Sequence, residues 1–381
     1  MRKGRIVVAA FVISLCWHAP AARADKLEDD LNTVWESLWD QRGALAPVVR
    51  WEGEVPFRFF GPDSARHQQH LLGAIQSASQ VTGLRFKDVS ADADAEKTAR
   101  LHIEVANNSA LNNNEPCLTR FVQFAVQELR RVNIQMRSSE AWRCTHHEVM
   151  HAMGISGHPS GKTVLSYFPY RRDVFMELDK LMLRAWYSAE MRAPTTPLQA
   201  LDVLVKTVAA QTDLGLDAAE AARRASAFGM ARVAELQALA QGNGDVPAIV
   251  KRSGKFSGNS SERLRLDAGF YVGLAYLQGT IVGKDEAQAA QWLKETAQRG
   301  YLPAQIMWSA VLADGTGVAV DIAEAYVWMY RAALSKPALV PVQKVLAAIE
   351  KKLPPDAIES LRARVALGLD SQAKTGEKVL P

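Results

Sequence analysis

A repeat of 36 residues in the second half of the chain is the strongest constraint on its fold. Eight residues recur in the same order 36 positions further along. The pairs are Ala268 and Ala304, Gly279 and Gly315, Thr280 and Thr316, Val282 and Val318, Asp285 and Asp321, Ala289 and Ala325, Trp292 and Trp328, and Ala297 and Ala333. A repeat of this length is one structural unit that buries its apolar face only by stacking on its neighbours, and the chain after Asp179 is helix-prone almost throughout. We therefore expect an all-α solenoid, with two helix-turn-helix repeats over residues 261–335.

The repeated residues resemble Sel-one-like repeats, which are relatives of tetratricopeptide repeats. Glu235 to Gly244 resembles a worn earlier copy, so residues 196–260 are expected to form a helical connector. Residues 336–381 are expected to supply capping helices and a tail. In the resembled family, the concave surface of the stack binds proteins. The resemblance therefore implies a protein partner of the bacterial envelope.

The first half contains a different motif, H-E-x-x-H, at residues 147–151. On a helix, His147 and His151 lie one turn apart on the same face and can direct two imidazoles at one zinc ion. Glu148 is then placed to act as general base toward a zinc-bound water. Gly154 suits the end of that helix, and the following turn brings His158 within reach as a third ligand. The alternative is a helix with surface histidines, although four of the seven histidines after residue 24 fall between residues 146 and 158. We expect His146 and His102 to face solvent.

This region resembles the metzincin metallopeptidases, whose zinc motif reads H-E-x-x-H-x-x-G-x-x-H. The residues from Thr163 to Phe168 resemble the turn beneath the metal in the serralysin branch. The resemblance implies that the Tyr167 hydroxyl approaches the zinc ion or an oxyanion; the alternative is a core aromatic. Two positions depart from the family pattern: the third histidine, His158, comes one residue late, and Leu165 replaces the methionine of the turn.

A second resemblance covers roughly residues 45–195. It is to an exported bacterial family of unknown function that is considered metzincin-like. It rests on Cys144, on the helix ending at Gly154 and on the segment Phe175–Tyr187. It implies an α+β metzincin-like domain, with a mixed sheet and a zinc-binding helix, over residues 25–195. Apolar alternation predicts strands at residues 48–51, 55–60, 101–105 and 132–136.

The first 24 residues have the pattern of an export signal. A basic start precedes an apolar core, Ile6–Trp17, and a small-x-small cleavage site at Ala22–Ala24. This predicts a periplasmic or secreted protein of a Gram-negative bacterium, without a membrane span in the mature chain. The formal charge of +4 is carried by Arg2, Lys3, Arg5 and Arg23. The mature chain is therefore near neutral, and its composition does not support nucleic-acid binding.

Two cysteines, Cys117 and Cys144, remain after the signal. In an oxidising compartment an isolated pair is expected to form a disulfide. The alternative, Cys144 as a zinc ligand, competes with the better-formed histidine pair.

Two functions follow from these residues. The first is an exported zinc-dependent metallopeptidase that hydrolyses peptide bonds and docks protein partners or substrates on its repeats. The alternative is a catalytically inactive, metzincin-like adaptor that acts through the repeats. The late His158 and the missing methionine favour the adaptor, whereas the complete H-E-x-x-H motif favours the peptidase.

Overall fold

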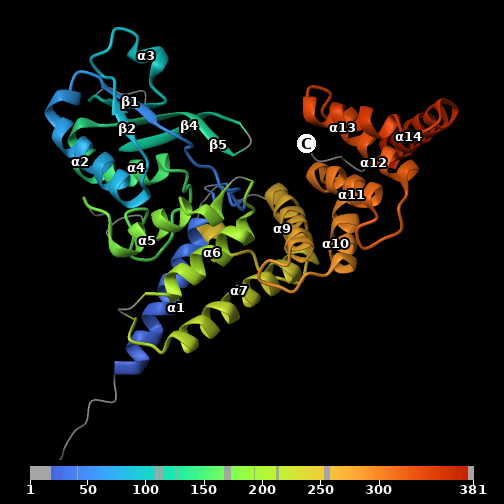
Figure 1. The fold of residues 1–381 in the computed structure, drawn as a ribbon, viewed down its shortest axis with the longest axis horizontal. Coiled ribbons are helices and arrows are strands. Elements are labelled where there is room, and N and C mark those ends of the chain that lie inside the picture. Colours follow the sequence, from blue (N-terminus) through green and yellow to red (C-terminus); the bar gives the residue numbers. More distant parts are fainter. Residues whose placement is uncertain are drawn as a thin grey trace, which may run out of the picture.

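A computed structural model of the chain describes residues 19–40, 42–107, 111, 115–125, 127–166, 173–192, 194–211, 214–252 and 258–375. Residues 1–18 of the predicted export signal, and Tyr167, lie outside the described residues. Figure 1 shows a sheet with its helices at one end of the molecule and a stack of helices at the other. We call residues 45–192 the sheet unit, residues 197–252 the connector, and residues 258–375 the helical arm.

The sheet has five strands: β1 (Val55–Phe60), β2 (Phe86–Asp88), β3 (Leu101–Val105), β4 (Cys117–Ala125) and β5 (Glu128–Met136). Their order is β2-β1-β3-β5-β4, and only β4, at one edge, runs antiparallel to its neighbour. Side chains alternate along β1, with Val55, Phe57 and Phe59 buried. The central strands pair Ile103 with Ile134. The predicted mixed sheet is thus observed.

Three longer helices accompany the sheet: α2 (Ser64–Thr82), α4 (Ala141–Ala152) and α5 (Glu177–Trp186), with a short α3 (Ala95–Thr98). The apolar residues of α2 recur at helical spacing and are buried: Leu71, Ala74, Ile75 and Ala78. Helix α4, which carries the H-E-x-x-H motif, packs on α2 and on strands β4 and β5. Consequently α4 is covered on several sides, and every residue from Cys144 to Ala152 is buried.

The expected strand at residues 48–51 is wrong. Arg50 makes only an isolated bridge to Glu128. Its guanidinium instead donates to the carbonyl oxygens of Trp186 and Ser188, at 3.2 and 3.0 Å. These bonds tie the segment to the end of α5. Its apolar residues are packed in the core without forming a sheet ladder.

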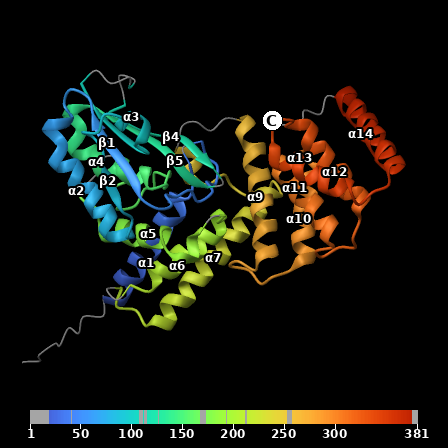
Figure 2. The ribbon, with the colours of Figure 1, turned by 45° about the horizontal axis from the view of Figure 1, so that its top comes forward.

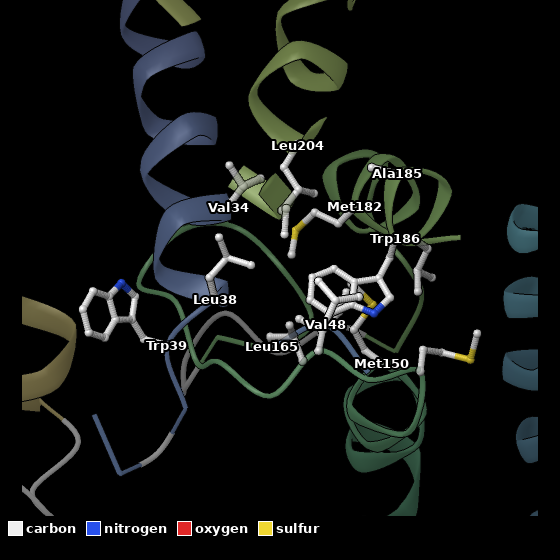
Figure 3. Close-up of a cluster of buried hydrophobic side chains, with 14 of the residues drawn as sticks. Val34, Leu38, Trp39, Val48, Met150, Leu165, Met182, Ala185, Trp186 and Leu204 are labelled. Carbon is white, nitrogen blue, oxygen red and sulfur yellow. The ribbon is translucent and has the colours of Figure 1, made fainter. Parts of the chain in front are cut away.

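A long N-terminal helix, α1 (Ala19–Ser37), packs against two connector helices, α6 (Pro197–Ala209) and α7 (Ala218–Ala240). Sequence reasoning assigned no structure to residues 25–39. Helix α1 and the residues after it meet the sheet unit in one apolar core, which also includes parts of α4, α5 and α6 (Figure 3). The labelled side chains of this core are Val34, Leu38, Trp39, Val48, Met150, Leu165, Met182, Ala185, Trp186 and Leu204.

The rest of the chain is helical: α8 (Ala248–Arg252), α9 (Gly258–Gln278), α10 (Glu286–Gln298), α11 (Leu302–Asp314), α12 (Ile322–Ser335), α13 (Val340–Glu350) and α14 (Pro355–Thr375). From α9 to α13 each helix packs on the next, as Figure 2 shows for the helical arm. The expected solenoid of helix pairs is therefore present. Helix α9 begins at Gly258, and residues 253–257 lie outside the described part.

The repeated residues have repeated structural roles. Asp285 and Asp321 are the N-caps of α10 and α12, and each accepts the backbone N–H three residues on, at 2.9 and 2.8 Å. Gly279 and Gly315 both have left-handed φ, of 70° and 72°. The repeated residues therefore mark the positions where helices begin and where the chain turns. None of the described helices combines the length and apolar character needed to cross a membrane.

Candidate metal centre

The three predicted imidazoles converge. The Nε2 atom of His151 lies 3.1 Å from Nε2 of His147 and 3.1 Å from Nε2 of His158. Two nitrogen ligands of a tetrahedral zinc ion, each ~2.0–2.1 Å from the metal, lie about 3.3 Å apart. The three side chains are buried, with 1, 6 and 9% of their surface exposed for His147, His151 and His158. The cluster can hold a metal ion.

Backbone carbonyls fix the ring orientation of the two helix histidines. Nδ1 of His147 lies 2.7 Å from the carbonyl oxygen of Val164, and Nδ1 of His151 lies 2.7 Å from that of Ile155. A carbonyl only accepts, so Nδ1 of each neutral ring carries the proton and Nε2 carries a lone pair. Two lone pairs at 3.1 Å repel each other, and a cation between them removes the repulsion. The donor set therefore fits a divalent metal that accepts imidazole.

The end of α4 lets the chain return toward the metal ligands. Gly154 follows the helix with φ of 105°, where a side chain is strained. A Cβ atom at this position would lie 1.9 Å from the carbonyl oxygen of Val49. Both the backbone conformation and the close approach therefore require glycine, and the turn begins where the sequence predicted it.

The residue that makes His158 late is accommodated by packing against α1. The Gly157 N–H donates to the carbonyl oxygen of Ser37 at 3.2 Å. A Cβ atom at position 157 would lie 2.5 Å from that oxygen, so glycine is needed here too. The extra residue lies in this contact, and the His158 ring still reaches the other two.

A buried carboxylate supports the turn beneath the centre. Asp179, on α5, accepts hydrogen bonds from the Val164 N–H at 3.2 Å, from the Met176 N–H at 2.8 Å and from the Thr163 hydroxyl. Burial raises the pKa of Asp179 to about 6, although these three donors oppose the rise. Since the Val164 carbonyl is the acceptor for His147, Asp179 holds a group that orients a candidate ligand. Sequence reasoning missed it.

Leu165 takes the position where the resembled family has methionine. Its side chain is fully buried in the core of Figure 3, which also contains Met150 of α4. Leucine and methionine have similar volumes, so the turn remains packed. Tyr167, which was expected to approach the metal or an oxyanion, lies outside the described residues.

Glu148 lies beside the three imidazoles. Its Oε1 is 3.7 Å from Nε2 of His147, and its side chain is 3% exposed. Its Oε2 accepts a hydrogen bond from the Thr119 hydroxyl at 2.7 Å. Thr119 is on the edge strand β4, two residues after Cys117 and so on the same face. This spacing from the cysteine was the signal in the sequence that would have pointed to Thr119.

The predicted disulfide between Cys117 and Cys144 is confirmed, with 6.1 Å between the Cα atoms. It joins the start of β4 to α4, three residues before His147. Strand β4, which carries Thr119, and helix α4, which carries Glu148, are therefore covalently linked.

The expected solvent exposure of His146 and His102 is wrong. His146 is 5% exposed, and its ring packs edge-on to Phe175 at 5.0 Å, away from the metal ligands. Burial lowers the pKa of His146 to about 4. His102 is 2% exposed, and its Nδ1 accepts from Arg58 Nε at 2.8 Å. Alternation along a strand could not reveal that the second face of β3 is covered as well.

No protein-family model matches the sequence, and no curated protein matches it. Among solved structures, a protective antigen of uropathogenic Escherichia coli with an SLR fold is 22% identical over 50% of this chain, with a TM-score of 0.26. A Sel1 repeat protein from Oxalobacter formigenes is 18% identical over 45% of this chain, with a TM-score of 0.21. The chain spans 40% and 55% of the lengths of those two structures. Scores of this size add nothing to the helix pairs already described.

Proposed function

We propose that this chain is an exported zinc-dependent hydrolase that cleaves peptide bonds and docks protein partners or substrates on its helical arm. The observation that supports it most is the convergence of three buried imidazole nitrogens beside the Glu148 carboxylate. An all-imidazole donor set suits zinc among the common biological metals. Glutamate next to the ligands matches catalysis better than metal storage.

The side chains divide the chemistry between them. Bound zinc would polarise the carbonyl under attack and lower the pKa of a water molecule near it. His147, His151 and His158 would hold the ion, and Glu148 Oε1 would take the proton from the attacking water. Glu148 would then give that proton to the leaving amine as the C–N bond breaks. The Thr119 hydroxyl holds the other carboxylate oxygen, Oε2, at 2.7 Å.

Peptide as the substrate class rests on the resemblance of residues 45–195 to metzincins. We propose that residues 1–24 are the export signal, residues 25–195 the catalytic domain, and residues 196–260 the connector. Residues 261–335 would be the two Sel-one-like repeats, with residues 336–381 as caps and tail. The repeats would bind a protein of the envelope.

The test compares purified wild type with Glu148→Gln, which keeps the shape of the side chain and removes its basicity. We expect one zinc per chain in both proteins, measured by elemental analysis. We expect peptide hydrolysis in the variant to fall by about 10²–10⁴-fold, the range for a positioned general base. Metal-free wild type, or equal hydrolysis in both proteins, would overturn the proposal.

A second function is favoured by the burial of the site. His147, Glu148, His151 and His158 are each less than 10% exposed. Such burial limits the access of a peptide substrate to the ion, and a structural metal does not need that access. An adaptor with a structural metal would retain stoichiometric zinc and hydrolyse no peptide in either protein of the same experiment.

A further inference from the structure

The segment that carries His158 is attached to the end of α1. Besides the Gly157 contact, Ser160 donates both its backbone N–H and its hydroxyl to Glu36 Oε2, at 2.6 and 2.8 Å. Gly161 lies so close to Thr33 that a Cβ atom would be 1.8 Å from its hydroxyl oxygen. The third candidate ligand is thus held by a helix that precedes the sheet unit.

The same carboxylate reaches the connector. Glu36 Oε1 accepts a hydrogen bond from an Arg252 guanidinium nitrogen at 2.6 Å, while its Oε2 binds Ser160. The Glu36 side chain is 14% exposed, and Arg252, the last residue of α8, is 46% exposed. Charge-assisted hydrogen bonds at these distances are stronger than neutral ones, and partial burial of the carboxylate reduces screening by solvent. Glu36 therefore joins the His158 segment to a helix about 90 positions further along the chain.

The other two imidazoles do not depend on this carboxylate. His147 and His151 lie on α4, and their Nδ1 atoms bond to Val164 and Ile155. If the Glu36 contacts are lost, two imidazoles keep their support and the His158 segment loses two hydrogen bonds. The expected product is a centre with two firm ligands and one loose ligand.

We infer that Glu36 is a positioning residue for His158, and that Arg252 holds Glu36 in place, so that α1 and the connector complete the metal centre of the sheet unit. This inference rests on the proposed metal centre. The role of Glu36 resembles that of an outer-shell partner but is exerted through Ser160 and not on the His158 ring. Loss of an outer-shell partner typically weakens metal binding by about 10–100-fold.

The test uses the full chain, loaded with Zn²⁺ or Co²⁺, and four variants. Glu36→Ala removes both contacts, whereas Glu36→Gln keeps an oxygen that can accept from Ser160 and removes the charge opposite Arg252. Arg252→Gln removes the same ion pair from the other side. Glu324→Gln is the control, because it breaks a comparable but more exposed ion pair, with Arg364 in the helical arm.

Zinc affinity is measured by competition with a chromophoric chelator, and the ligand set is read from the visible absorption spectrum of the Co²⁺-loaded protein. We expect Glu36→Ala to bind zinc about 10–100-fold more weakly than wild type and to show a Co²⁺ spectrum changed toward fewer nitrogen ligands. Glu36→Gln should recover most of the affinity and the wild-type spectrum. Arg252→Gln should resemble Glu36→Gln, and Glu324→Gln should match wild type.

Three results would overturn the inference in different ways. Wild-type affinity and spectrum in Glu36→Ala would show that α1 does not position His158, and would leave the proposed function standing. Weaker binding with an unchanged Co²⁺ spectrum would assign Glu36 a role in stability only. A wild-type protein that binds neither metal would remove the proposed function and this inference together. If Glu36→Ala does not fold, Glu36→Gln and Arg252→Gln carry the test. A small loss of zinc affinity of equal size in both, with the wild-type Co²⁺ spectrum, supports the inference, and zinc affinity equal to that of wild type in both overturns it.

Discussion

The sheet unit and the helical arm bury different kinds of side chain. Around α4 the sheet unit buries the three histidines and the one glutamate of the candidate centre, together with Asp179. The described residues of the arm bury mainly alanines, aromatics and aliphatics, and its clearest buried charge, Asp267, is bonded to Tyr301 and Arg263. Burying polar groups costs free energy unless each is bonded, so an assembly like that of the sheet unit needs a reason to persist. The candidate metal centre supplies that reason.

The two regions also differ in how far apart in sequence their contacts are. The centre draws on α1, β4, α4, the turn at residues 163–165 and α5, whereas each helix of the arm packs chiefly on its neighbours. Damage in the arm should therefore stay local. Damage in the sheet unit should reach the metal centre.

Trp328→Ala tests the local character of the arm. Trp328 is 7% exposed and packs in one cluster with Leu293 and Tyr301. Removing a buried tryptophan typically costs about 3–5 kcal/mol. We expect faster amide hydrogen exchange in α11–α13 and unchanged zinc affinity. Trp142→Ala, at a 58% exposed tryptophan, is the control and should change stability by less than about 0.5 kcal/mol. A tenfold loss of zinc affinity in Trp328→Ala would show that damage in the arm reaches the metal centre.

Loss of the disulfide should destabilise the sheet unit and leave the helical arm unchanged. Cys117 and Cys144 are separated by 27 positions, and opening a loop of this size costs about 3.5 kcal/mol in the chain-entropy model. We expect the double variant Cys117→Ala/Cys144→Ala to lose about that much unfolding free energy in urea, with faster exchange in β4 and α4 and unchanged exchange in α11–α13. Reduced wild type should behave like the variant. Equal loss of protection in both regions would contradict the expected separation.

The stability of the sheet unit should depend on pH through one buried group, Asp179. Its pKa is raised in the folded protein, from 3.8 to about 6, so the folded state keeps a proton that the unfolded state releases. The stability that protonated Asp179 contributes to the folded state is fully present below pH 4 and is lost as the pH rises through about 6. The change is on the order of 3 kcal/mol for a shift of about two units.

The measurement is the unfolding free energy of wild type minus that of Asp179→Asn at several pH values. We expect this difference to fall between pH 4 and pH 6 and to be flat above. Asparagine does not titrate, so contributions from other groups cancel in the difference. A difference that rises with pH would show that the three donors outweigh burial and lower the pKa of Asp179.

The sequence predicted more of the arm than of the centre. Asp285, Asp321, Gly279 and Gly315 act within a few residues of themselves, so their repetition identified caps and turns directly. His147 and His151 were equally predictable, because one turn of helix fixes their relation.

The remaining parts of the centre depend on contacts between distant segments. Glu36 and Asp179 reach the centre from α1 and α5, and neither lies in a motif. The position of His158 depended on whether the end of α1 could accommodate Gly157. Local patterns carry no information about such contacts, so the sequence left the third ligand open and missed the residues that hold it.

X-ray absorption at the zinc edge of the purified wild-type protein tests the central claim most directly. We expect one zinc per chain, with scattering from three imidazole nitrogens at ~2.0–2.1 Å and a change to two in His158→Ala. Zinc with the same number of imidazoles in both proteins would remove His158 from the centre. A wild-type protein without bound metal would show that the three imidazoles do not form a metal centre.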